Sequence, residues 1–470
     1  MAGSWVEEPE LGEFSVFNPA DDKVLASVAN TGPKTANTAI EKAVVAMEGW
    51  KRRTAKDRAH ILRKWFDLIL TNAEDLALIM TAEQGKPLAE SQAEIRYAAS
   101  FVEWFAEEGK RAYGDVIPAH APDLRLLTLK QPVGVVAAIT PWNFPSAMIT
   151  RKAAPALAAG CALVIKPAAE TPLSALALAE LAHRAGFPDG LINVVVGTDA
   201  VGIGGVLSGH PQVRKLTFTG STRVGKLLMA QCAATVKKTS MELGGNAPFI
   251  IFDDADLRAA VAGVMASKFR NAGQTCISAN RILVQEGIYP DFVRELTRAV
   301  KALRLGDGRD PDTDIGPLID GAALDNVDSL VRNALDGGAM AMAGGQASVL
   351  GGQFYEPTVL VDVTPEMRVF REEIFGPVAP VVRFSSEADA IAMANDTSAG
   401  LASYIYTQNV SRIFHMADVL DYGMVGINEG MISTEVAPFG GMKESGVGRE
   451  GSKYGIDDYL EIKYLCIRGG

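Results

Sequence analysis

The chain of 470 residues has few side chains that bind transition metals or form disulfides, with only four cysteines and five histidines. The cysteines show no C-x-x-C spacing and no cluster with histidine, which argues against a metal site and against a disulfide framework. Thiols that stay reduced are typical of the cytoplasm, so we expect a cytoplasmic protein.

The sequence also lacks a long apolar run and a surplus of positive charge. The most apolar stretch, residues 133–149, is broken by two prolines, a tryptophan and an asparagine, which excludes a membrane span. The acidic N-terminus, Met-Ala-Gly-Ser-Trp-Val-Glu-Glu-Pro-Glu, indicates neither a signal nor a transit peptide. The net charge of −11 argues against nucleic acid as a partner, because phosphate binding needs a basic surface. An anionic substrate would need arginines placed at the site itself.

The sequence does contain a repeated alternation of short apolar strands and helical segments, after a helical region at 35–113. We predict strands at 135–139, 162–165, 193–196, 215–219 and 236–240, and again at 248–252, 282–284, 358–361, 380–384, 402–407 and 424–427. Such alternation is typical of parallel sheets with helices on both faces. It predicts two α/β units, the first with the architecture of nucleotide-binding proteins.

Two further predicted strands stand apart from this pattern. They are Leu124–Lys130 and Tyr459–Ile467, far apart in the sequence and both alternating in polarity. They favour a small arm between subunits, the alternative being an extra edge on a domain sheet.

Two motifs point to chemistry. Residues 269–281 read Phe-Arg-Asn-Ala-Gly-Gln-Thr-Cys-Ile-Ser-Ala-Asn-Arg, so Cys276 lies in a turn between a predicted helix at 255–270 and a strand. A thiol there can serve as a nucleophile, although most single cysteines are small buried hydrophobes. Glu242 follows a predicted strand in Thr-Ser-Met-Glu-Leu-Gly-Gly-Asn-Ala-Pro. It could act as a general base or be an ordinary solvated or capping acid.

Together the two motifs match the signature pair of the NAD(P)-dependent aldehyde dehydrogenases. The chain resembles this family from about Phe17 to Lys463, most closely the succinate-semialdehyde dehydrogenases. The resemblance implies a Rossmann-like nucleotide-binding domain (residues 1–120, 133–242 and 437–456), an α/β catalytic domain (243–436) and a small β oligomerisation arm (121–132 and 457–470). It also implies a homo-oligomer, a dimer of dimers.

A candidate phosphate site lies at the strand-to-helix turn of residues 218–225, Phe-Thr-Gly-Ser-Thr-Arg-Val-Gly. Glycines allow close backbone approach, and a helix N-terminus favours a phosphate. The turn departs from G-x-G-x-x-G because Thr222 replaces the middle glycine. In the resembled family this segment binds the cofactor, which assigns Gly220, Ser221 and Gly225 to that role.

The resemblance assigns further cofactor contacts to Trp142, Lys166, Ala169, Leu243, Glu373 and Phe375. NAD-preferring members carry a glutamate where this chain has Ala169. Without that carboxylate a 2′-phosphate is not repelled, and Lys166 can attract it. We therefore expect NADP to be accepted and preferred, with NAD as the second cofactor.

The resemblance also implies a mechanism. Cys276 adds to the aldehyde, the thiohemiacetal gives up a hydride, and water activated by Glu242 hydrolyses the thioester. Asn143 and the Cys276 N–H would stabilise the oxyanion. Lys152 and Glu450 match residues of a proton relay, but they could equally be members of a structural ion pair.

The substrate inference rests on Arg151 and Arg270, which match positions that clamp the substrate carboxylate, with Ser433 as a third ligand. A guanidinium fork suits a carboxylate, whereas the ordinary role of an arginine is surface solvation. The expected substrate is succinate semialdehyde. The alternatives are glutarate semialdehyde or another small aldehyde, and a catalytically silent homologue, against which the intact set Cys276, Glu242 and Asn143 argues.

Overall fold

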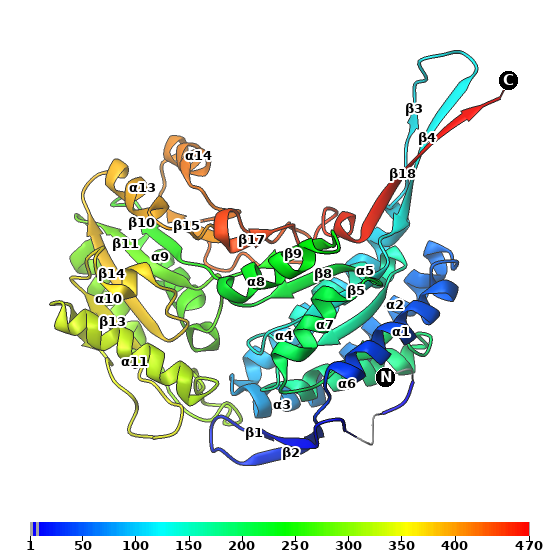
Figure 1. Cartoon of the computed structure of the whole chain (residues 1–470). Helices are drawn as coiled ribbons and strands as arrows, with labels where there is room; N and C mark the ends of the chain where they lie inside the picture. The colour runs from blue at the N-terminus through cyan, green and yellow to red at the C-terminus, as the bar shows by residue number, and fades with distance from the viewer. Residues whose placement is uncertain (1–2, 6–8, 470) are drawn as a thin grey trace.

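The computed structural model of the chain describes residues 3–5 and 9–469. It has two α/β units side by side and a slender arm that projects away from both (Figure 1). Apolar side chains form one core beneath each sheet. The alternating pattern of the sequence thus produced two layered units, as predicted.

The first unit is built on a six-stranded sheet in the order β17-β9-β8-β5-β6-β7. The strands are β5 (Val135–Ile139), β6 (Ala162–Lys166), β7 (Ile192–Val194), β8 (Val213–Thr219), β9 (Lys238–Glu242) and β17 (Gly446–Val447). All are parallel except β17, which pairs antiparallel with β9. The helices are α1 (Pro33–Trp50), α2 (Ala55–Thr71), α3 (Ala73–Gln84), α4 (Leu88–Glu108), α5 (Ala147–Ala159), α6 (Pro172–Ala185), α7 (Ala200–Gly209) and α8 (Thr222–Ala233).

The second unit holds a seven-stranded sheet in the order β12-β13-β14-β11-β10-β15-β16. The strands are β10 (Ala247–Ile251), β11 (Ala279–Gln285), β12 (Met340–Ala343), β13 (Thr358–Val361), β14 (Val378–Phe384), β15 (Ala402–Tyr406) and β16 (Met424–Ile427). Only the edge strand β12 runs antiparallel. The helices are α9 (Leu257–Val264), α10 (Tyr289–Lys301), α11 (Gly321–Asp336), α12 (Arg368–Arg371), α13 (Glu387–Asn395) and α14 (Val410–Val419).

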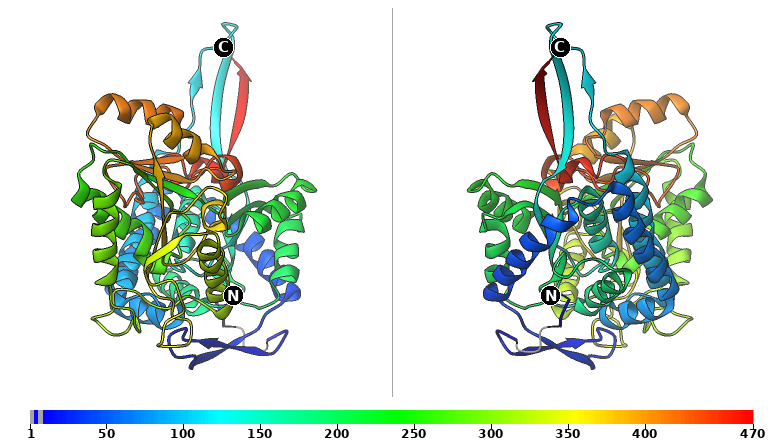
Figure 2. Two further views of the ribbon diagram at one scale, coloured as in Figure 1. Left: turned by 90° about the vertical axis from the view of Figure 1, so that its left-hand side faces the viewer. Right: turned by 90° about the vertical axis from the view of Figure 1, so that its right-hand side faces the viewer.

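The arm is a three-stranded sheet that stands clear of the body (Figures 1 and 2). The two predicted isolated strands, now β4 (Leu124–Pro132) and β18 (Leu460–Arg468), pair along their whole length from Leu460↔Pro132 to Arg468↔Leu124. A short third strand, β3 (Val116–Ile117), was not predicted. At the opposite end of the molecule lies a hairpin of β1 (Glu13–Phe17) and β2 (Val24–Ala29), also not predicted (Figure 2).

The strands of the first sheet end where the candidate site begins. β5, with the sequence Val-Val-Ala-Ala-Ile, is buried along almost its whole length, as expected of a central strand covered on both faces. Ligands of open parallel sheets bind at the carboxyl ends of strands. Here β5, β6, β8 and β9 lead into Asn143, Lys166, Gly220 and Glu242 respectively.

Candidate active site

An irregular turn positions Cys276. The α-helix predicted at 255–270 ends earlier, at Val264. A π-helical turn over Met265–Phe269 follows it, and then a 3₁₀ turn over Arg270–Gly273. Asn271 and Ala272 both adopt left-handed backbone, with φ of 51° and 53°. Such residues cost of order 1–3 kcal/mol each and persist where the surroundings hold them.

Contacts from the first unit hold this turn. The Asn271 backbone N–H donates to Glu90 Oε2 at 2.8 Å, and Asn271 Nδ2 donates to the Asn143 carbonyl at 2.9 Å. On the other side, a Cβ at Gly245 would lie 2.1 Å from the Cys276 carbonyl oxygen. The second glycine of the Glu-Leu-Gly-Gly motif is therefore required for Cys276 to approach it.

The Cys276 thiol is half-buried between charged groups. Burial raises its pKa to about 12, and the Glu373 carboxylate adds to this effect, while Arg151 and Arg270 oppose it. The resting thiol is protonated at neutral pH. Reaction therefore requires a change of surroundings or a proton acceptor at the moment of attack.

Glu242 is the last residue of β9. The sequence predicted that it comes after this strand, and that prediction was wrong. The strand continues to Glu242 because Gly446 of β17 pairs with it. Both of its carboxyl oxygens are buried and have no hydrogen-bond partner among the described residues. Burial and the Glu450 charge raise its pKa well above the usual range, despite Arg151 and Lys152. The site thus favours the neutral form of this carboxyl group over its charged form.

Arg151, Lys152 and Glu450 form a buried cluster next to Glu242. α5, which carries the two cations, is buried along its entire length. Arg151 Nε lies 3.0 Å from Glu450 Oε2, and Lys152 Nζ contacts Glu450 and donates to Thr219 Oγ1 at 2.7 Å. Burial would raise the pKa of Glu450, but Lys152 and Arg151 outweigh it and lower the pKa. The structure therefore brings the candidate relay residues together as an ion-paired cluster.

Asn143 is held next to the Cys276 turn, with Nδ2 donating to the Gln274 carbonyl at 3.0 Å. Its own carbonyl accepts from Lys86 Nζ at 2.7 Å. Lys86 also pairs with Glu94 at 2.5 Å, both side chains being about 1% exposed. No local pattern distinguishes Lys86 from an ordinary solvated lysine, so this support of Asn143 was missed.

The predicted substrate ligands face this same region from three elements. Arg270 Nε is buried and unpaired in the described part of the chain, and so is Arg151 Nη2. Tyr97 on α4 has charge interactions with both arginines and lies beside Ser433. Tyr97 was also missed, because one tyrosine in an amphipathic helix carries no distinguishing signal.

The cofactor candidates surround the ends of β6 and β8. Lys166 is 6% exposed, and its Nζ donates to the carbonyl of Pro167 at 3.1 Å, which leaves further N–H donors available.

Ser221 caps α8, and the Gly220 N–H donates to the Glu242 carbonyl at 3.0 Å. Gly225 lies against Leu243, where a Cβ would come within 2.4 Å of it. The N-terminus of α8 and the amine of Lys166 fit a dinucleotide phosphate.

The remaining cofactor candidates come from both units, Trp142 from the first and Glu373 and Phe375 from the second. The rings of Trp142 and Phe375 meet edge to face with centroids 5.6 Å apart, which brings the two segments into contact. Glu373 Oε1 accepts from the Gly245 N–H at 2.9 Å, and burial raises its pKa to about 7. These groups flank Cys276, as a bound nicotinamide would require.

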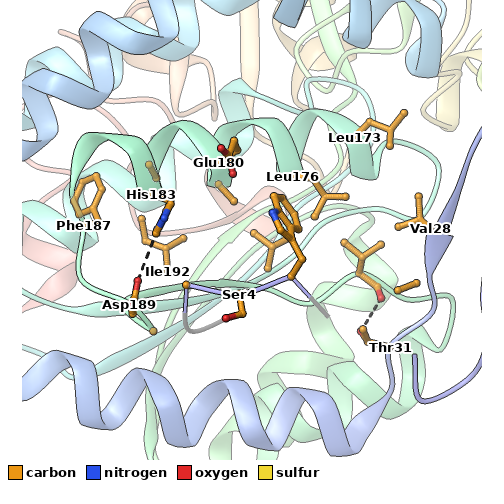
Figure 3. Close-up of a pocket in the computed structure, with 18 of the residues that line it drawn as sticks. Ser4, Val28, Thr31, Leu173, Leu176, Glu180, His183, Phe187, Asp189 and Ile192 are labelled. Atoms are coloured by element: carbon orange, nitrogen blue, oxygen red, sulfur yellow. Dashed lines mark hydrogen bonds and ion pairs between the residues drawn. The ribbon is translucent and has the colours of Figure 1, made fainter. Parts of the chain in front are cut away.

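A cavity away from this site lies between α6 and β2 and measures about 540 Å³. It is lined by Leu173, Leu176, Phe187 and Ile192, with His183 Nδ1 3.7 Å from Asp189 Oδ1 at its edge (Figure 3). It includes no residue assigned to the chemistry. Within residues 3–5 and 9–469 no helix is long and apolar enough to cross a membrane, and no cluster of three or more metal-binding side chains occurs.

Comparison with known proteins agrees with this geometry. Residues 5–465 match the aldehyde dehydrogenase family. The chain is 58% identical to a glutarate-semialdehyde dehydrogenase of Pseudomonas aeruginosa over 99% of this chain and 96% of that one. It is equally identical, with the same coverage, to the NADP-dependent succinate-semialdehyde dehydrogenase of Escherichia coli. The crystal structure of succinate-semialdehyde dehydrogenase from Burkholderia pseudomallei is 55% identical and superposes with a TM-score of 0.99 over 100% of this chain and 97% of that one. The chain belongs to the aldehyde dehydrogenase family.

Proposed function

We propose that this protein oxidises succinate semialdehyde to succinate with NADP or NAD. The observation that carries the proposal is the pair of buried, unpaired guanidinium nitrogens, on Arg151 and Arg270, next to the Cys276 turn. A buried guanidinium N–H without an acceptor costs free energy unless a ligand supplies one. An aldehyde whose far end is a carboxylate would do so.

The reaction uses Cys276 as the nucleophile. Its thiol gives up its proton to the ionised form of Glu242, whose charge acts on it, and the sulfur bonds to the aldehyde carbon. The resulting oxyanion accepts hydrogen bonds from Asn143 Nδ2 and the Cys276 N–H. A nicotinamide held by Trp142, Glu373 and Phe375 would supply the hydride acceptor, and loss of hydride from the thiohemiacetal gives the thioester. Water then adds to the thioester carbon as Glu242 takes its proton, the C–S bond breaks, and the acid and the thiol are released.

Glu242 acts as a base only in its ionised form, so it must release any proton it carries before each transfer. Lys152 and Glu450 lie beside it and extend to Thr219 at the end of β8, which supports a role for them in carrying that proton away. Because Glu450 is already ionised between two cations, its own pKa is lowered and it is a poor proton carrier by itself. Lys152 is the better candidate for transient proton transfer.

Cofactor choice follows from Ala169 and Lys166, with NADP preferred. The turn that binds the phosphates would be formed by Gly220, Ser221, Gly225 and Leu243. The nicotinamide end of the cofactor would be held by Trp142, Glu373 and Phe375. In domain terms, residues 1–120, 133–242 and 437–456 would bind the dinucleotide and residues 243–436 would supply Cys276. The relative from Escherichia coli is NADP-dependent, which supports this preference.

The arm of residues 121–132 and 457–470 would join subunits into a dimer of dimers. It exposes large apolar side chains on a sheet that lacks a core of its own, with Ile462 at 69% and Tyr464 at 56% exposure. Exposed apolar area of this kind marks a protein interface. The four free thiols support a cytoplasmic protein.

Glutarate semialdehyde is the second candidate substrate, because a glutarate-semialdehyde dehydrogenase is equally identical to this chain. The deciding experiment follows reduced nicotinamide by absorbance with succinate semialdehyde, glutarate semialdehyde and butanal, each with NADP and NAD. We expect the highest kcat/KM with succinate semialdehyde and NADP. A preference for butanal would refute an anionic substrate, and no reduction with any aldehyde would indicate a catalytically silent homologue.

A further inference from the structure

Tyr97 carries a polar group that the fold does not use. The side chain projects from α4, and its hydroxyl oxygen is buried without a hydrogen-bond partner among residues 3–5 and 9–469. Its ring packs edge to face on Phe101, with centroids 5.0 Å apart. Phenylalanine would make the same ring contact. Burying an unsatisfied hydroxyl costs about 1–3 kcal/mol, so this group destabilises the ligand-free protein.

The surroundings of this hydroxyl are those of an anion site. The Arg151 guanidinium lies 5.4 Å from the Phe101 ring centre and 4.0 Å from that of Phe439, so aromatic rings fix it beside Tyr97. Arg270 contributes a second positive charge, and Ser433 lies next to the phenol without a hydrogen bond of good geometry. Arg151 Nη2, Arg270 Nε and the Tyr97 hydroxyl are therefore all unsatisfied donors in one place.

We propose that Tyr97 is a specificity-determining residue whose hydroxyl donates a hydrogen bond to the anionic end of the aldehyde. This inference rests on the proposed function and adds a residue to it. A carboxylate offers about four lone-pair sites, so it can accept from a further donor beside Arg151 Nη2 and Arg270 Nε. A neutral donor on a third element completes the set without adding charge.

The phenol is in the right protonation state for this role. Burial raises the pKa of Tyr97, while Arg151 and Arg270 oppose the rise, so the hydroxyl keeps its proton at neutral pH. The proton it donates is not transferred in the reaction. Tyr97 therefore acts in binding and orientation, and its removal should affect KM for an anionic aldehyde more than kcat.

The test compares the wild type with Tyr97→Phe on succinate semialdehyde and on butanal, which has the same chain length without the charge. A hydrogen bond to a charged group is worth about 1.5–3 kcal/mol, so KM for succinate semialdehyde should rise about ten-fold or more. Kinetics with butanal should stay unchanged. Equal losses on both substrates, or no loss on the anionic one, would overturn the proposal.

The control is Tyr289→Phe, which removes another buried hydroxyl without a hydrogen-bond partner, beside Arg383 and on α10 of the second unit. It should leave both substrates unaffected. A second readout needs no turnover: succinate should raise the unfolding temperature of the wild type and of Tyr289→Phe, and should raise that of Tyr97→Phe much less. A Tyr97→Phe protein that fails to fold would show that the hydroxyl is structural, and would overturn the proposal.

The same data separate two failures. If the wild type itself shows no preference for succinate semialdehyde over butanal, the proposed function fails. If the wild type shows that preference and Tyr97→Phe retains it in full, only the role of Tyr97 fails. If Tyr97 acted solely by orienting Ser433, its removal would have no effect in a Ser433→Ala background, which would also contradict a direct contact.

Discussion

Arg151 and Glu450 form an ion pair inside the protein, with the guanidinium Nε 3.0 Å from the carboxylate and both side chains at most 4% exposed. Arg151 can therefore both neutralise Glu450 and bind the substrate. One edge of its fork holds Glu450, while Nη2 points to no acceptor in the described part of the chain. Arg270 has no ion pair among those residues, so the two arginines should respond differently to mutation.

Arg270→Ala should raise KM for succinate semialdehyde about ten- to a hundred-fold, because it removes a charge-assisted contact of about 1.5–3 kcal/mol. Steady-state kinetics on succinate semialdehyde and butanal measure this. Arg151→Ala should show the same loss together with a fall in stability of about 3 kcal/mol, because Glu450 loses one of its buried partners. Thermal unfolding checks the difference. Equal kinetic losses on butanal would mean that the arginines support the fold and do not bind the substrate.

Cys276→Ala should abolish oxidation, and Glu242→Gln should still give one rapid turnover of hydride before stalling at the thioester. Stopped-flow absorbance of the reduced nicotinamide distinguishes the two, and mass spectrometry should find an acyl group on Cys276 of the Glu242→Gln protein. Full turnover by Cys276→Ala would remove the thiol from the mechanism.

Thioester hydrolysis should become faster as pH rises. Burial and Glu450 raise the pKa of Glu242, and a general base works only in its unprotonated form, so activity is lost as pH falls through that raised pKa. Glu450→Gln removes a negative charge and should lower the pKa of Glu242, which moves the rise to lower pH. A single-turnover pH profile tests the sign, and a shift to higher pH contradicts it.

Ala169→Glu should lower kcat/KM for NADP about ten-fold or more, equivalent to ~1.4 kcal/mol, and improve the use of NAD. A carboxylate would repel the 2′-phosphate and accept a hydrogen bond from a 2′-hydroxyl. Ala169→Gln, of the same size without the charge, is the control and should change the ratio much less. A wild-type enzyme that uses NAD far better than NADP would contradict the starting point.

Lys86→Met should destabilise the protein by about 3–5 kcal/mol, because it leaves Glu94 as an unpaired buried charge. It should also lower kcat, because the Asn143 carbonyl loses one of its two donors and keeps only Asn271 Nδ2. Adding Glu94→Gln to the same chain should restore much of the unfolding temperature without restoring kcat. Recovery of both together would limit the ion pair to a role in stability.

The sequence was most informative where a pattern is local. Periodicity alone located β5, β13 and β16 to the residue, since each is an apolar run bounded by turn residues. β9 was placed two residues too early at both ends because its length depends on β17, which lies far along the chain. The contact between Lys86 and Asn143 and the left-handed turn at Asn271 depend equally on long-range packing, and no local pattern reports them.

The clustering of Arg151, Lys152 and Glu450 also constrains how the chain is made. Synthesis runs from the N-terminus, and the carboxylate that neutralises Lys152 comes 298 residues after it. A growing chain therefore presents α5 long before its counter-charge has left the ribosome. Because an uncompensated buried cation costs several kcal/mol, the core around α5 will stay open until that segment arrives. The last step of co-translational folding then also assembles the catalytic centre, and chains released early will be both inactive and exposed to proteolysis.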